Sequence, residues 1–264
     1  MPADILDSIV ARKHETLAAE KQALSLKKLE AMLGEPHIGI SMRKALAESS
    51  TGIISEFKRR SPSKGWIHQS ADPVEVTAAY EVAGASALSI LTDEPFFGGS
   101  LDDVKKVRPR VKLPILRKDF IIDVYQLFQA KIVGADAVLL IAACLSKERC
   151  RMLAREAHEL KLEVLLEIHS PEEEAYIWDE TDMVGVNNRN LGTFHTDVRN
   201  SFQLAEHVAL PDGTIFVSES GISSPATVKA LREAGFQGFL IGENFMKAPS
   251  PGAALAAFIK EMEA

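Results

Sequence analysis

Short apolar runs alternate with longer segments of helical pattern along most of the chain. Each run has four to seven residues, is rich in Val, Ile, Leu and Ala, and shows little alternation with polar residues. This pattern is typical of strands that are buried on both faces, as in a parallel sheet. Helix-like segments separate the runs. The predicted strands lie at residues 52–58, 87–91, 115–119, 137–142, 164–168, 183–187, 215–220 and 239–242.

Repeated start and stop signals frame the predicted helices. Gly84, Gly134 and Gly235 each follow a helical segment and come shortly before a strand, as expected of glycines that end a helix in the left-handed conformation. Three copies of this helix–glycine–strand unit indicate a repeated βα architecture. Four helices are expected to begin with a short polar capping residue followed by Pro, whose missing N–H costs nothing there. These starts are Asp72-Pro73, Ser170-Pro171, Ser224-Pro225 and Ser250-Pro251.

Eight strands that alternate with helices predict an α/β fold of one type, a single (β/α)8 TIM barrel. The competing fold, an open doubly wound sheet, would need a glycine-rich phosphate loop after its first strand. In this chain the first strand is followed by a basic loop rich in Ser and Pro, so the barrel is favoured. We expect one domain over residues 1–264, in which residues 49–264 form the barrel.

Residues 1–48 are predicted to be a helical extension that precedes the barrel. A first helix is expected over residues 1–33, before any strand, so it should pack onto another part of the protein. A second, shorter helix is expected over residues 42–48. The apolar residues that share one face of the first helix are Ile5, Leu6, Ile9, Val10 and Leu17.

The overall composition excludes several classes of protein. With 264 residues, of which 46% are hydrophobic, the chain can bury a large core without disulfide bonds. Its two cysteines, Cys144 and Cys150, match no zinc spacing and indicate a reducing compartment. A net charge of −7 disfavours nucleic-acid binding, and no apolar run has the length of a signal peptide or membrane span. We therefore expect a cytoplasmic protein whose partner is a small molecule, either a monomer or a larger assembly.

Polar residues gather at the C-terminal ends of the predicted strands, where barrel enzymes carry their active sites. Glu56 and Lys58 end the first strand, and they point to the same face because they are two residues apart. Lys118, Glu167 and Glu219 end three other strands. Two lysines and three glutamates on one rim predict a catalytic site in which crowding pushes the pKa values apart. The other polar residues at strand ends are Arg117, Asp119, Asn187, Arg189, Ser220, Gly221, Gly242 and Glu243.

Further residues on the predicted rim indicate the parts of a ligand. The loops after the last two strands contain Gly221 and Gly242, whose N–H groups could approach a phosphate, although each could equally be a turn glycine. Arg189 could add donors, and the Glu243 side chain is expected to point away. The apolar rim residues indicate a flat apolar part of the substrate, although loop packing explains the first of them nearly as well. They are Phe96, Phe97, Phe120 and Leu191.

The seven histidines give no sign of a metal site. They fall singly along the chain, and no pair has the spacing of metal ligands, so no metal is predicted. His169 is close to Glu167 in sequence, but it follows the predicted strand and is expected to face the other way. Any anion that binds must therefore be small and held by local side-chain charge.

With these residues placed, the chain resembles the indole-3-glycerol phosphate synthases of tryptophan biosynthesis over nearly its whole length. The E-x-K-x-x-S-P-S element at Glu56 and the L-R-K-D-F element around Lys118 are highly specific in combination. The segment ILDSIVARKHE (5–15) also resembles the extra helix with which this family covers the barrel mouth. The other similar segments are IISEFKRRSPSKG (53–65), SILTDEPFFGGS (89–100), PILRKDFIID (114–123), GADAVLLI (134–141), LLEIH (165–169), VGVNNRNLGTF (184–194), VSESGI (217–222) and FLIGENFM (239–246).

The resemblance implies a reaction without metal or cofactor. It is the closure, decarboxylation and dehydration of 1-(2-carboxyphenylamino)-1-deoxyribulose 5-phosphate to indole-3-glycerol phosphate. By resemblance Lys118 is the general acid that protonates the ketone oxygen, and Glu167 is the acid/base in the loss of water. Lys58 would hold the substrate carboxylate and aid dehydration. The residues implied to orient the lysines and the substrate hydroxyls are Glu56, Asn187 and Glu219.

The resemblance also assigns the two ends of the substrate. The residues implied to bind its phosphate are Ser61, Arg189, Ser220, Gly221 and Gly242, with the N–H of Glu243. The residues implied to form its aromatic pocket are Phe97, Phe120, Leu139 and Leu191. Two alternatives are a barrel like phosphoribosylanthranilate isomerase, which needs only one acid and one base, and a non-catalytic phosphate-binding barrel subunit. Association with other enzymes of tryptophan biosynthesis stays open.

Overall fold

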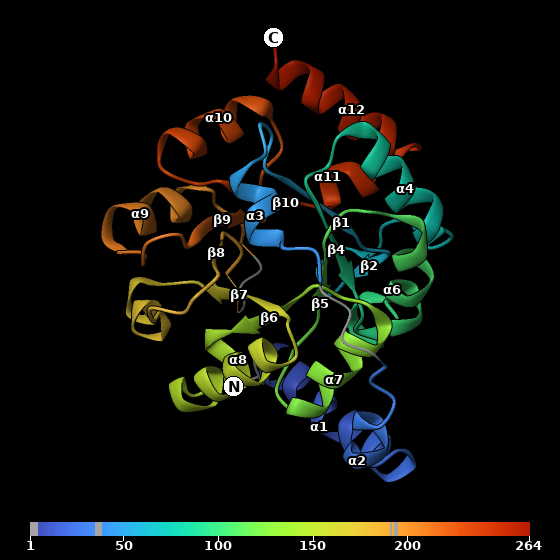
Figure 1. The fold of residues 1–264 in the computed structure, drawn as a ribbon. Helices are drawn as coiled ribbons and strands as arrows, with labels where there is room; N and C mark the ends of the chain where they lie inside the picture. Colours follow the sequence, from blue (N-terminus) through green and yellow to red (C-terminus); the bar gives the residue numbers. More distant parts are fainter. Residues whose placement is uncertain (1–4, 35–38, 191, 193–194) are drawn as a thin grey trace.

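The computed structural model of the protein describes residues 5–34, 39–190, 192 and 195–264. Eight parallel strands close into a barrel in which β1 pairs with both β4 and β10 (Figure 1). This confirms the predicted TIM barrel, and every predicted strand lies within one residue of an observed one at each end. The barrel strands are β1 (Ile53–Phe57), β4 (Ala87–Leu91), β5 (Ile115–Lys118), β6 (Ala137–Ile141), β7 (Glu163–Ile168), β8 (Met183–Asn187), β9 (Ile215–Glu219) and β10 (Gly238–Ile241).

Helices surround the barrel, and most begin and end as predicted. Asp72, Ser224 and Ser250 each accept a hydrogen bond from a backbone N–H in the first turn of their helix. Gly84, Gly134 and Gly235 all have positive φ, between 87° and 100°, where a side chain would be strained. The outer helices are α4 (Pro73–Ala83), α6 (Leu101–Val107), η1 (Arg108–Arg110), α7 (Val124–Val133), α8 (Lys147–Glu159), η3 (Pro171–Tyr176), α9 (Arg199–His207), α10 (Pro225–Glu233) and α12 (Pro251–Met262).

The prediction of a capped α-helix at Ser170-Pro171 is wrong. The segment η3 is a six-residue 3₁₀-helix, and the Ser170 side chain makes no capping hydrogen bond. The carboxylate of Glu173 instead accepts the backbone N–H of His169 at 2.6 Å, which ties this first turn back to the end of β7. Short 3₁₀ segments are a common way to connect elements where the chain turns tightly.

The N-terminal extension consists of separate helices and not of one long helix over residues 1–33. Helix α1 spans Ile5–Ala23 and α2 spans Leu26–Glu30, because Ser25 between them has an extended backbone (φ −65°, ψ 152°). Residues 1–4 lie outside the described part of the chain. Val10 is only partly buried, so the buried stripe of α1 also differs from the predicted one. The buried residues of α1 are Leu6, Ile9, Lys13 and Leu17.

The third helix, α3 (Met42–Ala47), closes the end of the barrel where the strands begin, and in Figure 1 it lies in front of the strands. Met42 and Leu46 are fully buried among the residues that point into the barrel. Strand alternation divides the core into this inner layer and a larger outer layer between strands and helices. The opposite end of the barrel, where the strands end, is therefore the open one.

The connections on that open side contain several short elements. Inside the loop after β1, two-residue strands form a small antiparallel hairpin that begins directly after Arg59. Helix α5 carries the aromatic residues of the loop after β4, and α11 begins directly after Gly242. These elements are β2 (Arg60–Ser61), β3 (Gly65–Trp66), α5 (Glu94–Phe97), η2 (Ala142–Cys144) and α11 (Glu243–Met246).

Candidate active site

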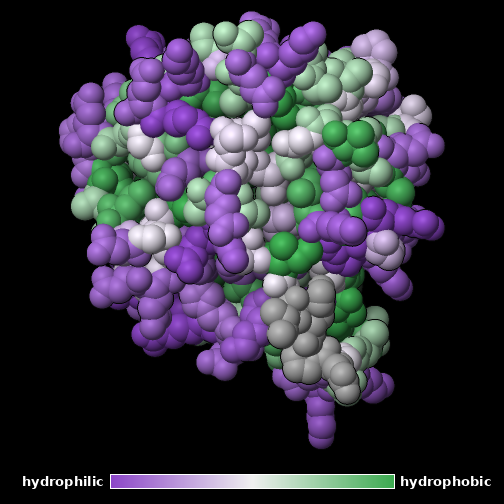
Figure 2. Space-filling model, turned by 45° about the horizontal axis from the view of Figure 1, so that its top comes forward, coloured by the Kyte–Doolittle hydropathy of each residue, from purple (hydrophilic) through white to green (hydrophobic). Residues whose placement is uncertain are grey.

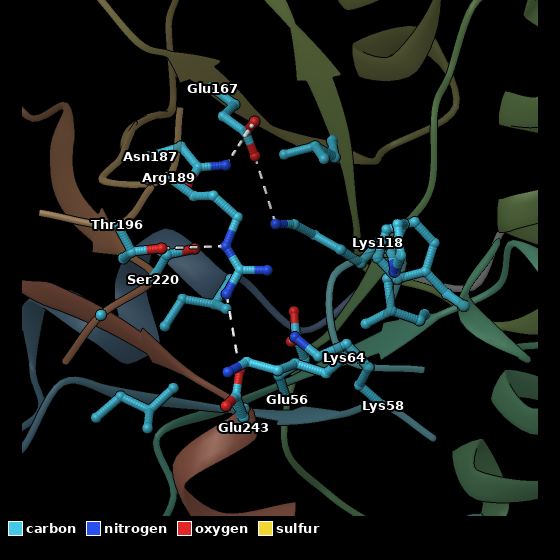
Figure 3. Close-up of a pocket in the computed structure, with 18 of the residues that line it drawn as sticks. Glu56, Lys58, Lys64, Lys118, Glu167, Asn187, Arg189, Thr196, Ser220 and Glu243 are labelled. Carbon is cyan, nitrogen blue, oxygen red and sulfur yellow. Dashed lines mark hydrogen bonds and ion pairs between the residues drawn. The ribbon is translucent and has the colours of Figure 1, made fainter. Parts of the chain in front are cut away.

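A cavity of about 380 Å³ lies at the C-terminal ends of the strands. Residues from most of the barrel strands and from helix α1 line it, so the extension forms one wall of the site. Figure 3 shows the charged side chains of this cavity converging from β1, β5, β7 and β8. The sequence-predicted residues that line it are Glu56, Lys58, Phe97, Lys118, Asp119, Phe120, Leu139, Glu167, Asn187, Arg189, Ser220, Gly221, Gly242 and Glu243.

Lys118 lies between two buried carboxylates. Its Nζ is 2.7 Å from Oε2 of Glu219 and 3.4 Å from Oε2 of Glu167, and the contact with Glu167 is drawn in Figure 3. Asn187 donates its side-chain N–H to the other oxygen of Glu167, at 3.1 Å. Arg117, which precedes Lys118 in β5, does not line the cavity, because side chains alternate along a strand. Three strand ends thus place one lysine in contact with two glutamate side chains.

The two carboxylates beside Lys118 have different pKa values, as their crowding predicted. Burial opposes ionisation of both, but Lys118 and then His169 lower the pKa of Glu167 to about 2. For Glu219, burial and the repulsion from Glu167 outweigh the attraction of Lys118 and raise its pKa to about 7. Burial lowers the pKa of Lys118, yet the surrounding glutamates raise it above the usual lysine value. Lys118 is therefore charged, and Glu167 is a carboxylate, at neutral pH.

A second lysine–glutamate pair forms the next part of the wall. Lys58 Nζ is 2.5 Å from Oε1 of Glu56, and both side chains are largely buried. Burial opposes ionisation of Glu56, but Lys58 and Lys118 lower its pKa. Gly242 leaves the space for this carboxylate, because a Cβ at this position would lie 2.4 Å from Glu56 Oε1. The absence of a side chain at Gly242 therefore makes room for Glu56, in addition to the role in phosphate binding that was predicted for Gly242.

Arg189 lies at the other end of the cavity, where it bridges several loops. Its guanidinium is 3.1 Å from Ser63 Oγ and 3.3 Å from Thr196 Oγ1. The prediction that the Glu243 side chain points away is wrong, since its Oε2 is 3.7 Å from Arg189 Nη2. Opposite charges on facing loops of this partly exposed rim attract each other. Arg189 thus has a carboxylate and hydroxyl groups around it.

The chain turns sharply next to Arg189. Ser220 and Gly221 both have positive φ, 70° and 76°, and two such residues in a row bend the backbone directly after β9. For a residue other than glycine this conformation is uncommon and is often found at functional sites. Ser61 does not line the cavity, and its buried Oγ has no hydrogen-bond partner among the described residues. Pro62 and Lys64 of the same loop do line it.

Apolar side chains form the remaining wall of the cavity. The rings of Phe97 and Phe120 are 6.1 Å apart and inclined by 38°. Leu139 lines the same cavity, whereas Phe96 does not. Leu191 lies outside the described residues. Ile5, Leu6 and Ile9 of helix α1 also line the cavity, which confirms that the N-terminal extension lies over the barrel mouth.

Sequence reasoning missed two charged residues that support the site. Lys13 of α1 forms buried ion pairs with Asp93 at 2.8 Å and with Asp119 at 2.7 Å. The second is His169. The expectation that it faces away from Glu167 is wrong, because its Nε2 is 3.1 Å from Oε1 of Glu167. The signal was present in the segment LLEIH, since residues two apart on an extended chain share a face. Lys13 gave no such signal, because a lysine on a helix is usually solvated.

The comparisons with known proteins agree with this geometry. A family model described as indole-3-glycerol phosphate synthase matches residues 6–258. The chain belongs to the indole-3-glycerol phosphate synthase family. It therefore has the activity of this family, that of a carboxy-lyase of tryptophan biosynthesis.

Relatives in this family match the chain over nearly its full length. An indole-3-glycerol phosphate synthase from Bacteroides thetaiotaomicron is 62% identical over 260 residues, which cover 98% of this chain and 99% of the relative. Another, from Polaromonas sp., is 41% identical and covers 96% of this chain and 97% of the relative. The family thus accounts for the extension as well as the barrel.

Solved structures of other barrels share the fold alone. A 3-hexulose-6-phosphate synthase from Salmonella typhimurium superimposes with a TM-score of 0.61 at 13% identity, covering 80% of this chain and 98% of that one. A tryptophan synthase α-subunit from Pyrococcus furiosus superimposes with a TM-score of 0.60 at 16% identity, covering 81% of this chain and 98% of that one.

In the part of the chain that is described, no helix is long and apolar enough to span a membrane. The same residues contain no group of three or more His, Cys, Asp or Glu arranged to hold a metal ion.

Proposed function

We propose that the cavity binds 1-(2-carboxyphenylamino)-1-deoxyribulose 5-phosphate in one orientation and converts it to indole-3-glycerol phosphate. The carbon chain of this substrate separates an anionic phosphate from an aromatic ring with a carboxylate. The cavity has a matching division, with Arg189 at one end and the rings of Phe97 and Phe120 at the other. The observation that carries the proposal is Lys118 held between Glu167 and Glu219 in the middle of this cavity.

Ring closure is the step assigned to Lys118. As the aromatic carbon attacks the ketone, the ketone oxygen gains negative charge and needs a proton. The two carboxylates beside Lys118 keep the ammonium charged, so a proton is available at the start of the reaction. The bound substrate would take the place of part of these ion pairs. The proton would then pass from Nζ to the new hydroxyl group.

Decarboxylation and dehydration follow without a cofactor. The closed intermediate carries an iminium next to the carboxylate. The iminium accepts the electron pair of the breaking C–C bond as CO2 leaves. Lys58, oriented by Glu56, is assigned to the substrate carboxylate and then to the departing hydroxyl group. Glu167 takes the C–H proton whose loss, together with the departure of the hydroxyl group, forms the five-membered aromatic ring of the indole. Asn187 and Glu219 orient Glu167 and Lys118 in these steps.

The phosphate is assigned to Arg189 and the loops around it. Arg189 offers a planar set of donors that fits a phosphate group. The backbone turn after β9 and the start of α11 complete the binding site in this proposal. Cationic side chains that line the same cavity, Lys64 and Lys247, add positive charge that the sequence reasoning had not included. The assigned residues that line the cavity are Arg189, Ser220, Gly221, Gly242 and Glu243, the last through its N–H, whereas Ser61, which the resemblance also implies, does not line it.

We also propose that the enzyme works as a monomer in the cytoplasm. Residues of one chain line the cavity, which supports a catalytically complete monomer of one domain over residues 1–264. The face of the molecule seen in Figure 2 is mostly hydrophilic, with apolar side chains in small scattered groups, and this also supports a monomer. Its biosynthetic reaction and its unpaired cysteines support a cytoplasmic location.

Turnover of the substrate by variants tests the assignments. Without added metal or cofactor, indole absorbance and fluorescence should appear with the wild-type protein. Lys118→Ala and Glu167→Gln should each lower kcat by about 10²–10⁴-fold, the usual contribution of general acid–base catalysis. Lys106→Ala is the matched control, because this lysine forms an exposed ion pair with Asp102 on helix α6. Near-wild-type kcat in a folded Lys118→Ala protein would show that the assigned role is wrong.

A further inference from the structure

His169 lies between two carboxylates directly after β7. Its Nε2 is 3.1 Å from Oε1 of Glu167, and its Nδ1 is 3.6 Å from Oε2 of Glu173. The backbone N–H of His169 also donates to Glu173, at 2.6 Å. Only 15% of the His169 side chain is exposed, and it does not line the cavity. Any effect of His169 on the reaction must therefore pass through Glu167.

The two oxygens of Glu167 have separate surroundings. Oε1 contacts Asn187 at 3.1 Å and His169 at 3.1 Å, whereas Oε2 faces Lys118 at 3.4 Å. Oε1 accepts a hydrogen bond from the Asn187 amide, and it makes an ion-pair contact with the His169 ring, whose nitrogens make no hydrogen bond to the described residues. Together these two contacts restrict the rotation of the carboxylate about its last bond. Oε2 is then the oxygen turned toward Lys118, the residue assigned to donate a proton to the substrate.

Charges around His169 favour its protonated form. Glu167 from β7 and Glu173 from η3 face the ring, Lys118 lies beyond Glu167, and the Cys144 thiol of η2 is close to both carboxylates. Burial lowers the pKa of His169, but the two glutamates outweigh it and raise the pKa to about 10. The Cys144 pKa is raised to about 12 by burial and by these same glutamates, so the thiol is neutral. His169 is thus a cation across the physiological pH range.

We propose that His169, held by Glu173, is a positioning residue that binds Oε1 of Glu167 and leaves Oε2 as the atom that exchanges protons with the substrate. This rests on the proposed acid/base role of Glu167. In the step, Oε2 takes one proton as the substrate C–H bond breaks, and its electron pair enters the indole ring. The C–O bond breaks as the hydroxyl group takes a proton from Lys58, the residue assigned to it above, and leaves as water. The imidazolium itself keeps its proton throughout and stabilises the anionic form of Glu167.

The pH dependence of kcat/KM tests this arrangement. His169→Gln keeps a hydrogen-bond donor but removes the positive charge, so the acid limb should move upward by about one pH unit. At neutral pH, kcat should fall about tenfold with less than twofold change in KM. Glu173→Gln should leave the acid limb in place and move the alkaline limb to lower pH, because the imidazolium loses one carboxylate. Glu172→Gln, at an exposed neighbouring position, is the control and should change neither limb.

A double variant separates this inference from the function on which it rests. If His169 acts through Glu167, adding His169→Gln to Glu167→Gln should cause no further loss of kcat. Independent, multiplied losses would overturn the inference, as would a wild-type pH profile in His169→Gln. Should His169→Gln fail to fold, the alkaline limb of Glu173→Gln decides alone. Full activity of Glu167→Gln would instead contradict the role proposed for Glu167.

Discussion

Replacing Lys13 by Met should destabilise the protein far more than replacing a neighbouring lysine on the same helix. Lys13 is 10% exposed, and its partners Asp93 and Asp119 are 3% and 2% exposed. Asp119 would keep Arg117 at 2.9 Å and Thr92 at 2.6 Å. Among the described residues, Asp93 would keep as a side-chain partner only the backbone N–H of Phe96, which donates to its other oxygen. The variant therefore leaves one buried carboxylate oxygen without a partner.

The expected size of the effect follows from this burial. Removing one partner of a buried ion pair costs about 3–5 kcal/mol, and we expect the lower end because Asp119 keeps its other partners. For a chain of this length, about 3 kcal/mol lowers the melting temperature by roughly 6–12 °C. Lys21 also forms an ion pair from α1, with Asp123 at 2.7 Å, but its side chain is 40% exposed. Lys21→Met should cost about 0.5 kcal/mol and 1–2 °C.

Thermal unfolding followed by circular dichroism at pH 7 measures both variants. The double variant Lys13→Met/Asp93→Asn should regain part of the lost stability, because it removes the unpaired charge. Melting temperatures that are equal in Lys13→Met and Lys21→Met would refute the reasoning. The Lys13 variant should also show a raised KM, since α1 supplies part of the apolar wall of the cavity.

Two further predictions concern a glycine and a histidine. Gly185→Ala should lower kcat about 10²-fold, because the new Cβ would lie 2.1 Å from Glu219 Oε1 and displace that carboxylate from Lys118. Gly34→Ala is the control and should keep full activity, because Gly34 has open space around it. Equal kcat values in the two variants would contradict this prediction. His158 bonds Asp182 at 2.7 Å, and this bond raises its pKa against the effect of burial. A folded-state pKa above the unfolded value gives stability that is fully present below about pH 6.5 and is lost as pH rises. The stability difference between wild type and His158→Gln, measured by urea unfolding, should thus shrink from pH 6 to pH 9, and a constant difference would exclude this linkage.

Much of the barrel and of its catalytic rim could be predicted from local pattern. The strands are continuous apolar runs whose ends are marked by charge, so Lys118 and Glu167 could be placed at a common rim before any contact was known. Alternation along a strand also implies the pairing of Glu167 with His169, which the end of the predicted strand at residue 168 obscured. These features depend on residues close together in sequence, where the geometry of a strand fixes directions.

Features that depend on distant partners could not be predicted in the same way. Lys13 is buried only because Asp93 and Asp119, far away in the sequence, meet it at the mouth of the barrel. The contact of Arg189 with Glu243 likewise depends on how two loops face each other. The break at Ser25 has neither Gly nor Pro to mark it. In each case tertiary contacts outweigh the local preference of the chain.

The position of Lys13 also has a consequence for the order of events during synthesis. Helix α1 is made before the barrel, and Asp119, which pairs with Lys13, is made 106 residues later than Lys13. At a translation rate of about 5–20 residues per second, the helix must wait roughly 5–20 s for that partner. A single helix of 19 residues is marginally stable by itself in water. The nascent chain therefore passes through a period in which its first helix has no barrel to pack against, and a chaperone that binds short apolar segments would have its best opportunity then.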